Sequence, residues 1–447
     1  MNKSIKILLL AGATTFLVTA CDSRLDVQPT QSIEAGTALA TEQDVQITLT
    51  GTYDGISDVN VYGGGIQYMG DLLGDDRDVV FGGTFTTLDE IWRKSITTSN
   101  TVVRDFWLDS YNAINRANNV LNALSKVGEA NRGNIEGQAR FIRGLVYFDL
   151  VRFFGKSWND GTPAQNPGVP LVLTPTSAVT EADNRKRNTV AEVYTQVLDD
   201  LTKAEQLLPA RQTGGTGFAT KGAAQAILAR VYLQQGNFAA ARDAANRVIT
   251  SGQYSLAPSY AEAFTDASPE TVFKIIVTDQ DGVNDLNTYF ASTTNQGRGD
   301  VRVQQKYRQQ FAAGDVRGTF FTTTGQNTFT NKFNDRFGDV PVVRLAEMHL
   351  IRAEANVRLN AAVGATPLAD VNAIRARAGA APLTAVTLAS VLTERRLELA
   401  FEGQQIHDVK RTGASVGSTA FSANNLILPI PQREIDTNKE LTQNQGY

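Results

Sequence analysis

The chain has 447 residues, of which 42% are hydrophobic and 20% charged, with a formal net charge of −4. That length allows two or three average domains or one large repeat-built domain, and the mixed charge argues against nucleic acid, whose binding surfaces need a concentrated basic patch. A single cysteine excludes an intrachain disulfide and a cysteine-built metal site, and two histidines outside any metal-ligand spacing argue against a zinc centre.

The start of the chain predicts a bacterial lipoprotein signal peptide over residues 1–20. Two early lysines form a positive region, and residues 7–18 are apolar but too few to span a bilayer permanently. Small residues directly before Cys21 resemble a lipobox, in which the cysteine carries acyl chains such as palmitate. An ordinary signal peptide with a chance cysteine is the alternative. We favour lipid attachment at Cys21, because the only cysteine of the chain stands at the cleavage point.

After a tether over residues 21–40, a first helix is expected from about Thr41. The glycine-rich and aromatic stretch 61–92 is expected to form a long functional loop, since glycine permits close backbone approach and long loops in compact domains usually carry function. A helix is expected over 105–125. The next, over 136–154, has an apolar face wide enough to pack on more than one neighbour.

The next segments have the pattern of paired helices. Thr189 and Glu192 form a capping box at the start of a helix that ends at Pro209. Residues 219–249 read as a helix-turn-helix with part of the tetratricopeptide-repeat spacing, and residues 340–379 repeat that layout. Four degenerate pairs follow, near 41–124, 136–207, 219–250 and 343–378. The predicted fold class is all-α, a tetratricopeptide-like helical scaffold with long, irregular binding loops and minor β structure.

The stretch from 340 to 413 is the densest in matched charges. An apolar stripe is expected on one helix, formed by Val343, Ala346, Leu350, Ala353 and Val357. Glu354 and Arg358 have the spacing of an i,i+4 ion pair. Before this stretch, residues 271–278 have the composition of a strand.

No catalytic motif accounts for the carboxylates of this region. Glu394, Glu398 and Glu402 fall on one helix face, and neighbouring members could approach the separation of a retaining glycosidase pair. Arg395 and Arg396 lie between them, so we expect neutralised carboxylates with depressed pKa values rather than general acids. The segment 279–285 has oxygen ligands for calcium but lacks EF-hand spacing, which makes an Asx-rich turn the default. No cofactor is expected.

Aromatic rings in glycine-rich loops favour a binding module. Such rings can stack on sugars while Asp, Asn and Arg side chains bind hydroxyl groups. The available platforms are Trp92, Trp107, Trp158, Tyr62, Tyr68 and Tyr289. The alternative is that each ring packs under its own loop, and Trp107 is expected in the core because it adjoins a periodic helix.

Several segments, in order, resemble the SusD/RagB family of outer-membrane nutrient-binding lipoproteins. They are QARFIRGLVYFDLVRFFG (138–155), VAEVYTQVLDDLTKAEQLLP (190–209), AAQAILARVYLQQGNFAAA (223–241), RLAEMHLIRAEANVRL (344–359), ERRLELAFEG (394–403) and the closing LPIPQREID…LTQNQGY. The resemblance implies four tetratricopeptide-like units in one domain over 41–447, with loop insertions near 54–104 and 251–339. It also implies a lipid anchor, a surface-facing outer-membrane location and delivery of oligosaccharide to a SusC-like TonB-dependent transporter.

Family sites are built from the N-terminal inter-helix loops and the insertion before the last repeat. By position, the resemblance points to a ligand-binding site formed by Asp75, Arg77, Trp92, Tyr289 and Arg298. The chain departs from the family at Gln404, Gln405 and Ile406, where an Arg or His with an aromatic is usual. Asp22 would be an inner-membrane retention signal in some bacteria. The sequence thus favours non-catalytic capture of a glycan or other nutrient over a scaffold for a protein or peptide, and both over a surface hydrolase.

Overall fold

Packed helix pairs form the larger part of the protein. The computed structural model describes residues 39–177 and 180–447. Helices make up 52% of the structure and strands 7%. The signal peptide, Cys21 and nearly all of the predicted tether lie outside the described residues. Among the described helices, none is both long and apolar enough to cross a bilayer.

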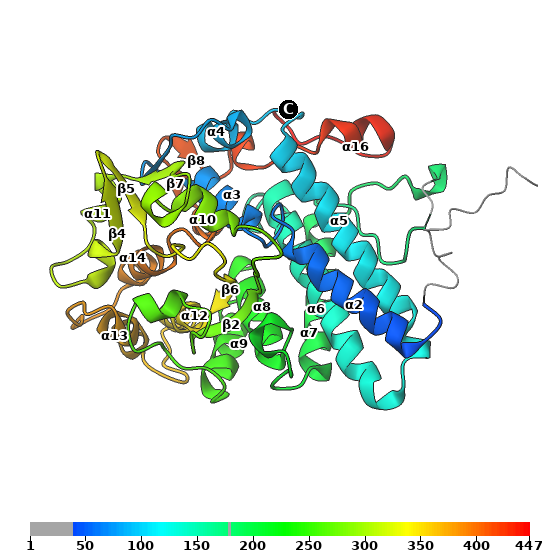
Figure 1. Cartoon of the computed structure of the whole chain (residues 1–447), viewed down its shortest axis with the longest axis horizontal. Coiled ribbons are helices and arrows are strands. Elements are labelled where there is room, and N and C mark those ends of the chain that lie inside the picture. The colour runs from blue at the N-terminus through cyan, green and yellow to red at the C-terminus, as the bar shows by residue number, and fades with distance from the viewer. Residues whose placement is uncertain (1–38, 178–179) are drawn as a thin grey trace, which may run out of the picture.

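The four predicted pairs are present (Figure 1). They are α2 (Glu42–Ser57) with α5 (Thr101–Asn122), α6 (Glu129–Phe154) with α7 (Val190–Leu207), α8 (Lys221–Gln234) with α9 (Phe238–Thr250), and α12 (Leu345–Arg358) with α13 (Pro367–Arg377). Neighbouring pairs also pack on each other, through α5 with α6, α7 with α8, and α9 with α12. The all-α, tetratricopeptide-like fold class is therefore confirmed.

Side-chain caps fix where the helices begin. Thr41 accepts a hydrogen bond from the backbone N of Asp44, whose side chain bonds back to the N of Thr41, so α2 starts where the sequence predicts. The predicted capping box of Thr189 and Glu192 starts α7 in the same way. These reciprocal bonds satisfy donors that a helix start would otherwise leave unpaired.

Helix α6 runs through the centre of the core. Every residue from Phe141 to Phe154 is buried, because α6 packs against α5 on one side and α7 on another. The wide apolar face of this helix is thus confirmed. Trp107 of α5 is 3% exposed and packs on Phe154, as expected for a core residue.

The glycine-rich stretch 61–92 is not one long loop, so that prediction was wrong. It contains α3 (Gly65–Gly74), β1 (Val79–Phe81) and α4 (Thr86–Arg93), and every residue of α3 is buried. A Cβ atom added at Gly70 or Gly74 would lie closer than 3.0 Å to the backbone at Gly403 and Ile406. The glycines let a buried helix approach the segment that starts α15 (Gln405–Thr412).

Strand β2 (Thr271–Ile275) confirms the predicted strand and pairs antiparallel with β6 (Val340–Arg344). Because β6 extends to Arg344, Val343 lies in a strand and not on the helix stripe, which corrects that part of the prediction. Helix α12 begins at Leu345. Within it, the expected ion pair of Glu354 and Arg358 is present at 2.9 Å.

A second strand pair joins the two regions expected to hold the binding site. Strand β1 pairs antiparallel with β3 (Val301–Val303), with Phe81 opposite Val301. The remaining elements are α10 (Asp285–Phe290), α11 (Gln305–Arg308), β4 (Phe321–Thr324), β5 (Asn327–Thr330), α14 (Leu388–Leu399), β7 (Ser415–Val416), β8 (Thr419–Ala420) and α16 (Gln432–Thr437). Figure 1 places α4 and the β7–β8 hairpin along the upper edge, with α9 at the opposite, lower edge.

Candidate binding site

Three of the predicted site residues line one surface pocket. Asp75, Arg77 and Trp92 surround a space of about 280 Å³. Lys94 and the β7–β8 turn, residues 416–418, complete the wall. A volume of this size lies just below the usual range for small-molecule sites, roughly 300 to 1,000 Å³.

Asp75 holds the pocket together from beneath. Its carboxylate accepts hydrogen bonds from the backbone N atoms of Asp78 at 2.8 Å and Val79 at 3.0 Å, and from Nε1 of Trp92 at 2.9 Å. Burial raises the pKa of Asp75, and these three bonds oppose the rise. The carboxylate therefore fixes the orientation of the Trp92 ring.

The open charges of the pocket are cations. Arg77 is exposed, has a left-handed backbone (φ 64°) and makes no ion pair with any described residue. Lys94 donates from Nζ to the carbonyl oxygens of Asp75 at 3.2 Å and Trp92 at 3.0 Å, and burial lowers its pKa. Asp76, by contrast, is paired with Lys306 at 2.9 Å. Arg77 thus offers hydrogen-bond donors that no group among the described residues occupies.

Tyr289 and Arg298 do not line the pocket. They gather around Phe85, which precedes α4, whereas Trp92 lies near the end of that helix. The Arg298 guanidinium carbon lies 4.6 Å from the Phe85 ring centroid, and the Tyr289 ring meets Phe85 edge-on at 6.0 Å. Eight helical residues span ~12 Å, so about that distance along α4 separates the two groups. Phe85, 42% exposed, supplies an apolar surface there.

The other predicted aromatic platforms face inward. Tyr62 and Tyr68 are 1% and 2% exposed, so neither can stack on a ligand, and the alternative that a ring packs under its own loop holds for both. Trp158 is half-buried and its ring packs on Tyr194 at 5.1 Å. Sequence reasoning missed Phe85 and Lys94. The signal for Phe85 was a ring directly after Gly82-Gly83-Thr84, at the start of a short helix.

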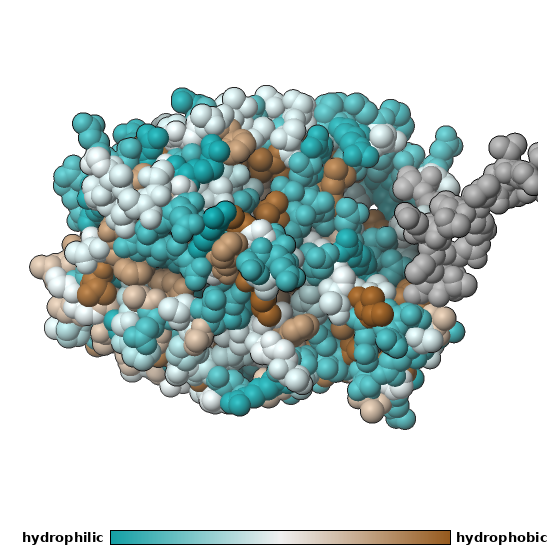
Figure 2. Space-filling view, viewed as in Figure 1, coloured by the Kyte–Doolittle hydropathy of each residue, from teal (hydrophilic) through white to brown (hydrophobic). Residues whose placement is uncertain are grey.

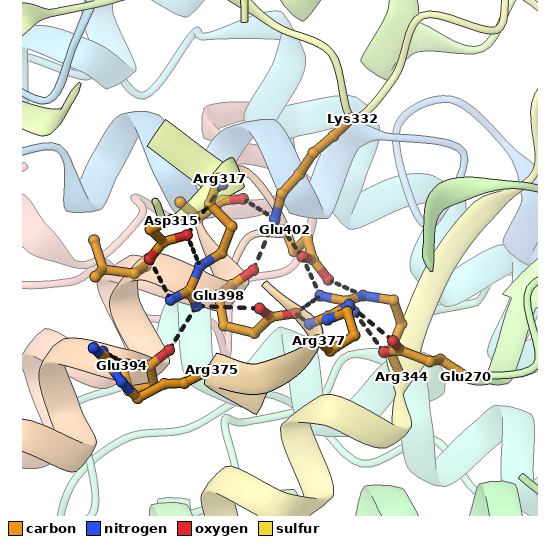
Figure 3. A network of polar contacts seen from close by, with 12 residues as sticks. Glu270, Asp315, Arg317, Lys332, Arg344, Arg375, Arg377, Glu394, Glu398 and Glu402 are labelled. Atoms are coloured by element: carbon orange, nitrogen blue, oxygen red, sulfur yellow. Dashed lines mark hydrogen bonds and ion pairs between the residues drawn. The ribbon is translucent and has the colours of Figure 1, made fainter. Parts of the chain in front are cut away.

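A buried ionic network holds Glu394 and Glu398 of α14 (Figure 3). It also holds Glu402, which lies beyond the end of α14 and not on the same helix face as expected. Five acidic and five basic side chains share it: Glu270, Asp315, Glu394, Glu398 and Glu402 with Arg317, Lys332, Arg344, Arg375 and Arg377. Burial alone would raise the pKa of Glu398, but the guanidinium groups around it lower that pKa to about 2. The pKa of Glu402 is also lowered. The expected neutralisation is thus confirmed for these two groups.

The neutralising partners differ from those expected. Arg395 contacts Glu347 and Asp408, and Arg396 contacts Asp78, so neither pairs with the three carboxylates of the predicted row. The contact between Arg396 and Asp78 has another consequence. It ties α14 to the loop that carries Asp75 and Arg77, so the scaffold fixes one edge of the pocket.

Two family models match the chain. One, described as starch-binding and associating with the outer membrane, matches residues 25–233, and the SusD family model matches residues 330–424. SusD-like protein P2 of Formosa agariphila is 24% identical, over 95% of this chain and 96% of its own length. The starch-binding protein SusD of Bacteroides thetaiotaomicron is 23% identical, over 69% of this chain and 72% of its own length.

Solved structures agree with these matches. A SusD superfamily protein from Bacteroides vulgatus is 27% identical, with a TM-score of 0.81, over 91% of this chain and 99% of that one. The chain therefore belongs to the SusD/RagB family of outer-membrane glycan-binding proteins. It is a binding protein and not an enzyme.

Proposed function

We propose that the protein captures an oligosaccharide in the pocket of Asp75, Arg77 and Trp92. The observation that carries the proposal is a half-exposed indole, fixed by Asp75, beside an exposed Arg77 that has no ionic partner among the described residues. A sugar ring can stack its C–H face on the indole and accept hydrogen bonds from the guanidinium through its hydroxyl oxygens. In a longer oligosaccharide, further sugar units would contact Phe85, Tyr289 and Arg298 at the other end of α4.

We further propose that the protein is anchored by lipid on Cys21 in the outer membrane, faces the cell surface and passes the sugar to a SusC-like TonB-dependent transporter. The family description, associating with outer membrane, supports this placement. In a Cys21→Ser variant we expect the protein to leave the membrane fraction. Retention of that variant in the outer membrane would contradict the lipid anchor.

Removal of the Trp92 ring tests the ligand site. We expect Trp92→Ala to weaken binding of at least one member of a neutral hexasaccharide panel about tenfold, because truncation of a central aromatic typically costs that much affinity. Isothermal titration calorimetry with maltohexaose, cellohexaose and laminarihexaose measures the effect. Trp158→Ala is the matched control, since Trp158 packs on Tyr194 outside the pocket. Unchanged affinity in Trp92→Ala across the panel would contradict the site, and binding of peptides without sugars would favour a protein scaffold.

A further inference from the structure

A second pocket lies between α2, the start of α6 and the loop before α8. Its volume is about 300 Å³. In Figure 1 the blue N-terminal end of α2 lies at the lower right, away from α4 at the upper edge. None of the described residues that line it is charged, although 20% of the chain is. Five side-chain amides contribute instead: Gln46, Asn131, Asn134, Gln138 and Gln212.

A closed set of hydrogen bonds holds the inner amides. The Tyr53 hydroxyl donates to Oε1 of Gln138 at 2.8 Å and accepts from the backbone N of Ala219 at 2.9 Å. Nε2 of Gln212 donates to the carbonyl oxygen of Ala219 at 2.8 Å and to Oδ1 of Asn134 at 2.7 Å. Gln138, only 6% exposed, completes the set by donating to the same oxygen of Asn134 at 3.3 Å. The inner wall is thus rigid before any ligand arrives.

The floor of this pocket is apolar and aromatic. The rings of Tyr53 and Phe218 meet edge-on with centroids 4.9 Å apart, beside Leu49 and Ile135. Gly214 permits this arrangement, since a Cβ atom there would overlap the Phe218 ring.

The rim keeps polar groups available. Oε1 of Gln46, Oδ1 of Asn131 and the hydroxyl of Thr213 accept or donate no hydrogen bond among the described residues. The amide nitrogens of Gln46 and Asn131 are occupied, because both donate to the carboxylate of Glu42. These contacts hold the amides of Gln46 and Asn131 at the rim, where their oxygens can accept hydrogen bonds from a ligand.

We propose that this amide-lined pocket is a second carbohydrate site, for a neutral sugar ring. A pyranose has one apolar C–H face and a rim of uncharged hydroxyls, which match the floor and the amides in turn. A charged ligand would leave its ion unpaired against neutral walls. Two sites on one chain can hold one long polysaccharide at two points. The first contact then raises the effective concentration of the polysaccharide at the second site, which strengthens attachment. This pocket and the first pocket have only the class of ligand in common.

Calorimetry on four proteins tests this site: the wild type, Trp92→Ala, Phe218→Ala and the double variant, each titrated with the same neutral hexasaccharides. We expect Trp92→Ala to retain binding, and the double variant to bind about tenfold more weakly than Trp92→Ala. Gln46→Ala, at an exposed position that does not contribute to the core, is a second variant and is expected to weaken the residual binding about threefold.

The outcomes separate the two sites. Loss of all binding in Trp92→Ala would overturn the second site and leave the first intact, as would unchanged residual binding in both Phe218→Ala and Gln46→Ala. Binding that is unaffected by Trp92→Ala but lost in Phe218→Ala would support the second site and overturn the first. A crystal soaked with the bound hexasaccharide should show a sugar ring against Tyr53 and Phe218, and an empty pocket at saturation would overturn the proposal.

Discussion

Individual residues in the first pocket divide into those that face its open space and those that hold others in place. Arg77 and Trp92 face that space, whereas the carboxylate oxygens of Asp75 accept hydrogen bonds from three protein donors. Position in the family order was enough to bring these three together from sequence. It could not separate their roles, because the hydrogen bonds of a carboxylate depend on a backbone path that spacing does not reveal. Lys94 was missed for the same reason, since its side chain bonds to the backbone carbonyl oxygens of Asp75 and Trp92.

Removing the carboxylate of Asp75 should cost stability as well as binding. Asp75→Ala leaves two backbone N–H groups and the indole N–H without their acceptor, so we expect the free energy of unfolding to fall by ~1–3 kcal/mol. Urea denaturation measures this change. Asp76→Ala is the control, because Asp76 pairs with the half-exposed Lys306 and should matter less. Equal effects of the two substitutions would contradict the supporting role of Asp75.

At the scale of elements, periodicity and capping predicted the helix pairs well. The wide apolar face of α6 and the capping box of α7 are local properties of the sequence, so both helices could be predicted. Helix α3 could not be found this way. Its glycines suit a loop by local preference, and only contact with residues more than 300 positions later explains Gly70 and Gly74. Strand β6 was likewise not predicted, because its partner strand β2 lies far away in the chain.

A pair of glycine substitutions tests the packing of α3. Gly70→Ala places a methyl group against the backbone of Gly403, so we expect a loss of ~1–3 kcal/mol in the free energy of unfolding. Gly51→Ala, in α2, meets no atom within 4 Å and should stabilise the protein by ~0.4–1 kcal/mol. Thermal and urea unfolding compare the two. A Gly70→Ala protein as stable as the wild type would show that α3 and the Gly403 segment are not tightly packed.

Across the whole molecule, the ionic network of Figure 3 joins distant parts of the chain. It links residues beside β2 and β5 with β6, α13 and α14, and so fixes the segment 251–339 on the last helices. Its five acids and five bases balance. Buried charges are tolerable only when paired, so removal of one member leaves its partners uncompensated. The matched Arg and Glu residues of the sequence predicted such pairing, but they did not show which residues form the pairs.

Substitution of Glu398 should therefore be severe. We expect Glu398→Gln to lower the free energy of unfolding by ~3–5 kcal/mol, because three guanidinium groups lose a shared anion. Glu205→Gln breaks a more exposed pair with Arg247 and should cost ~0–1 kcal/mol.

Acid provides a second test of the same network. The pKa of Glu398 is lowered from 4.5 to about 2, so its contribution to stability is complete above pH 4.5 and disappears as the pH falls toward 2. The wild type should lose stability steeply across that window, and Glu398→Gln less steeply. Parallel pH profiles of the two proteins would contradict this assignment.

The contact between Asp78 and Arg396 bears on the order of events during biosynthesis. Its two residues are 318 positions apart, and the β7–β8 turn that completes the pocket comes later still. A polypeptide that emerges N-terminus first therefore exposes Trp92 long before the opposite wall exists. If this pocket holds the ligand as proposed, capture requires that the C-terminal segment has first folded back to form the second wall.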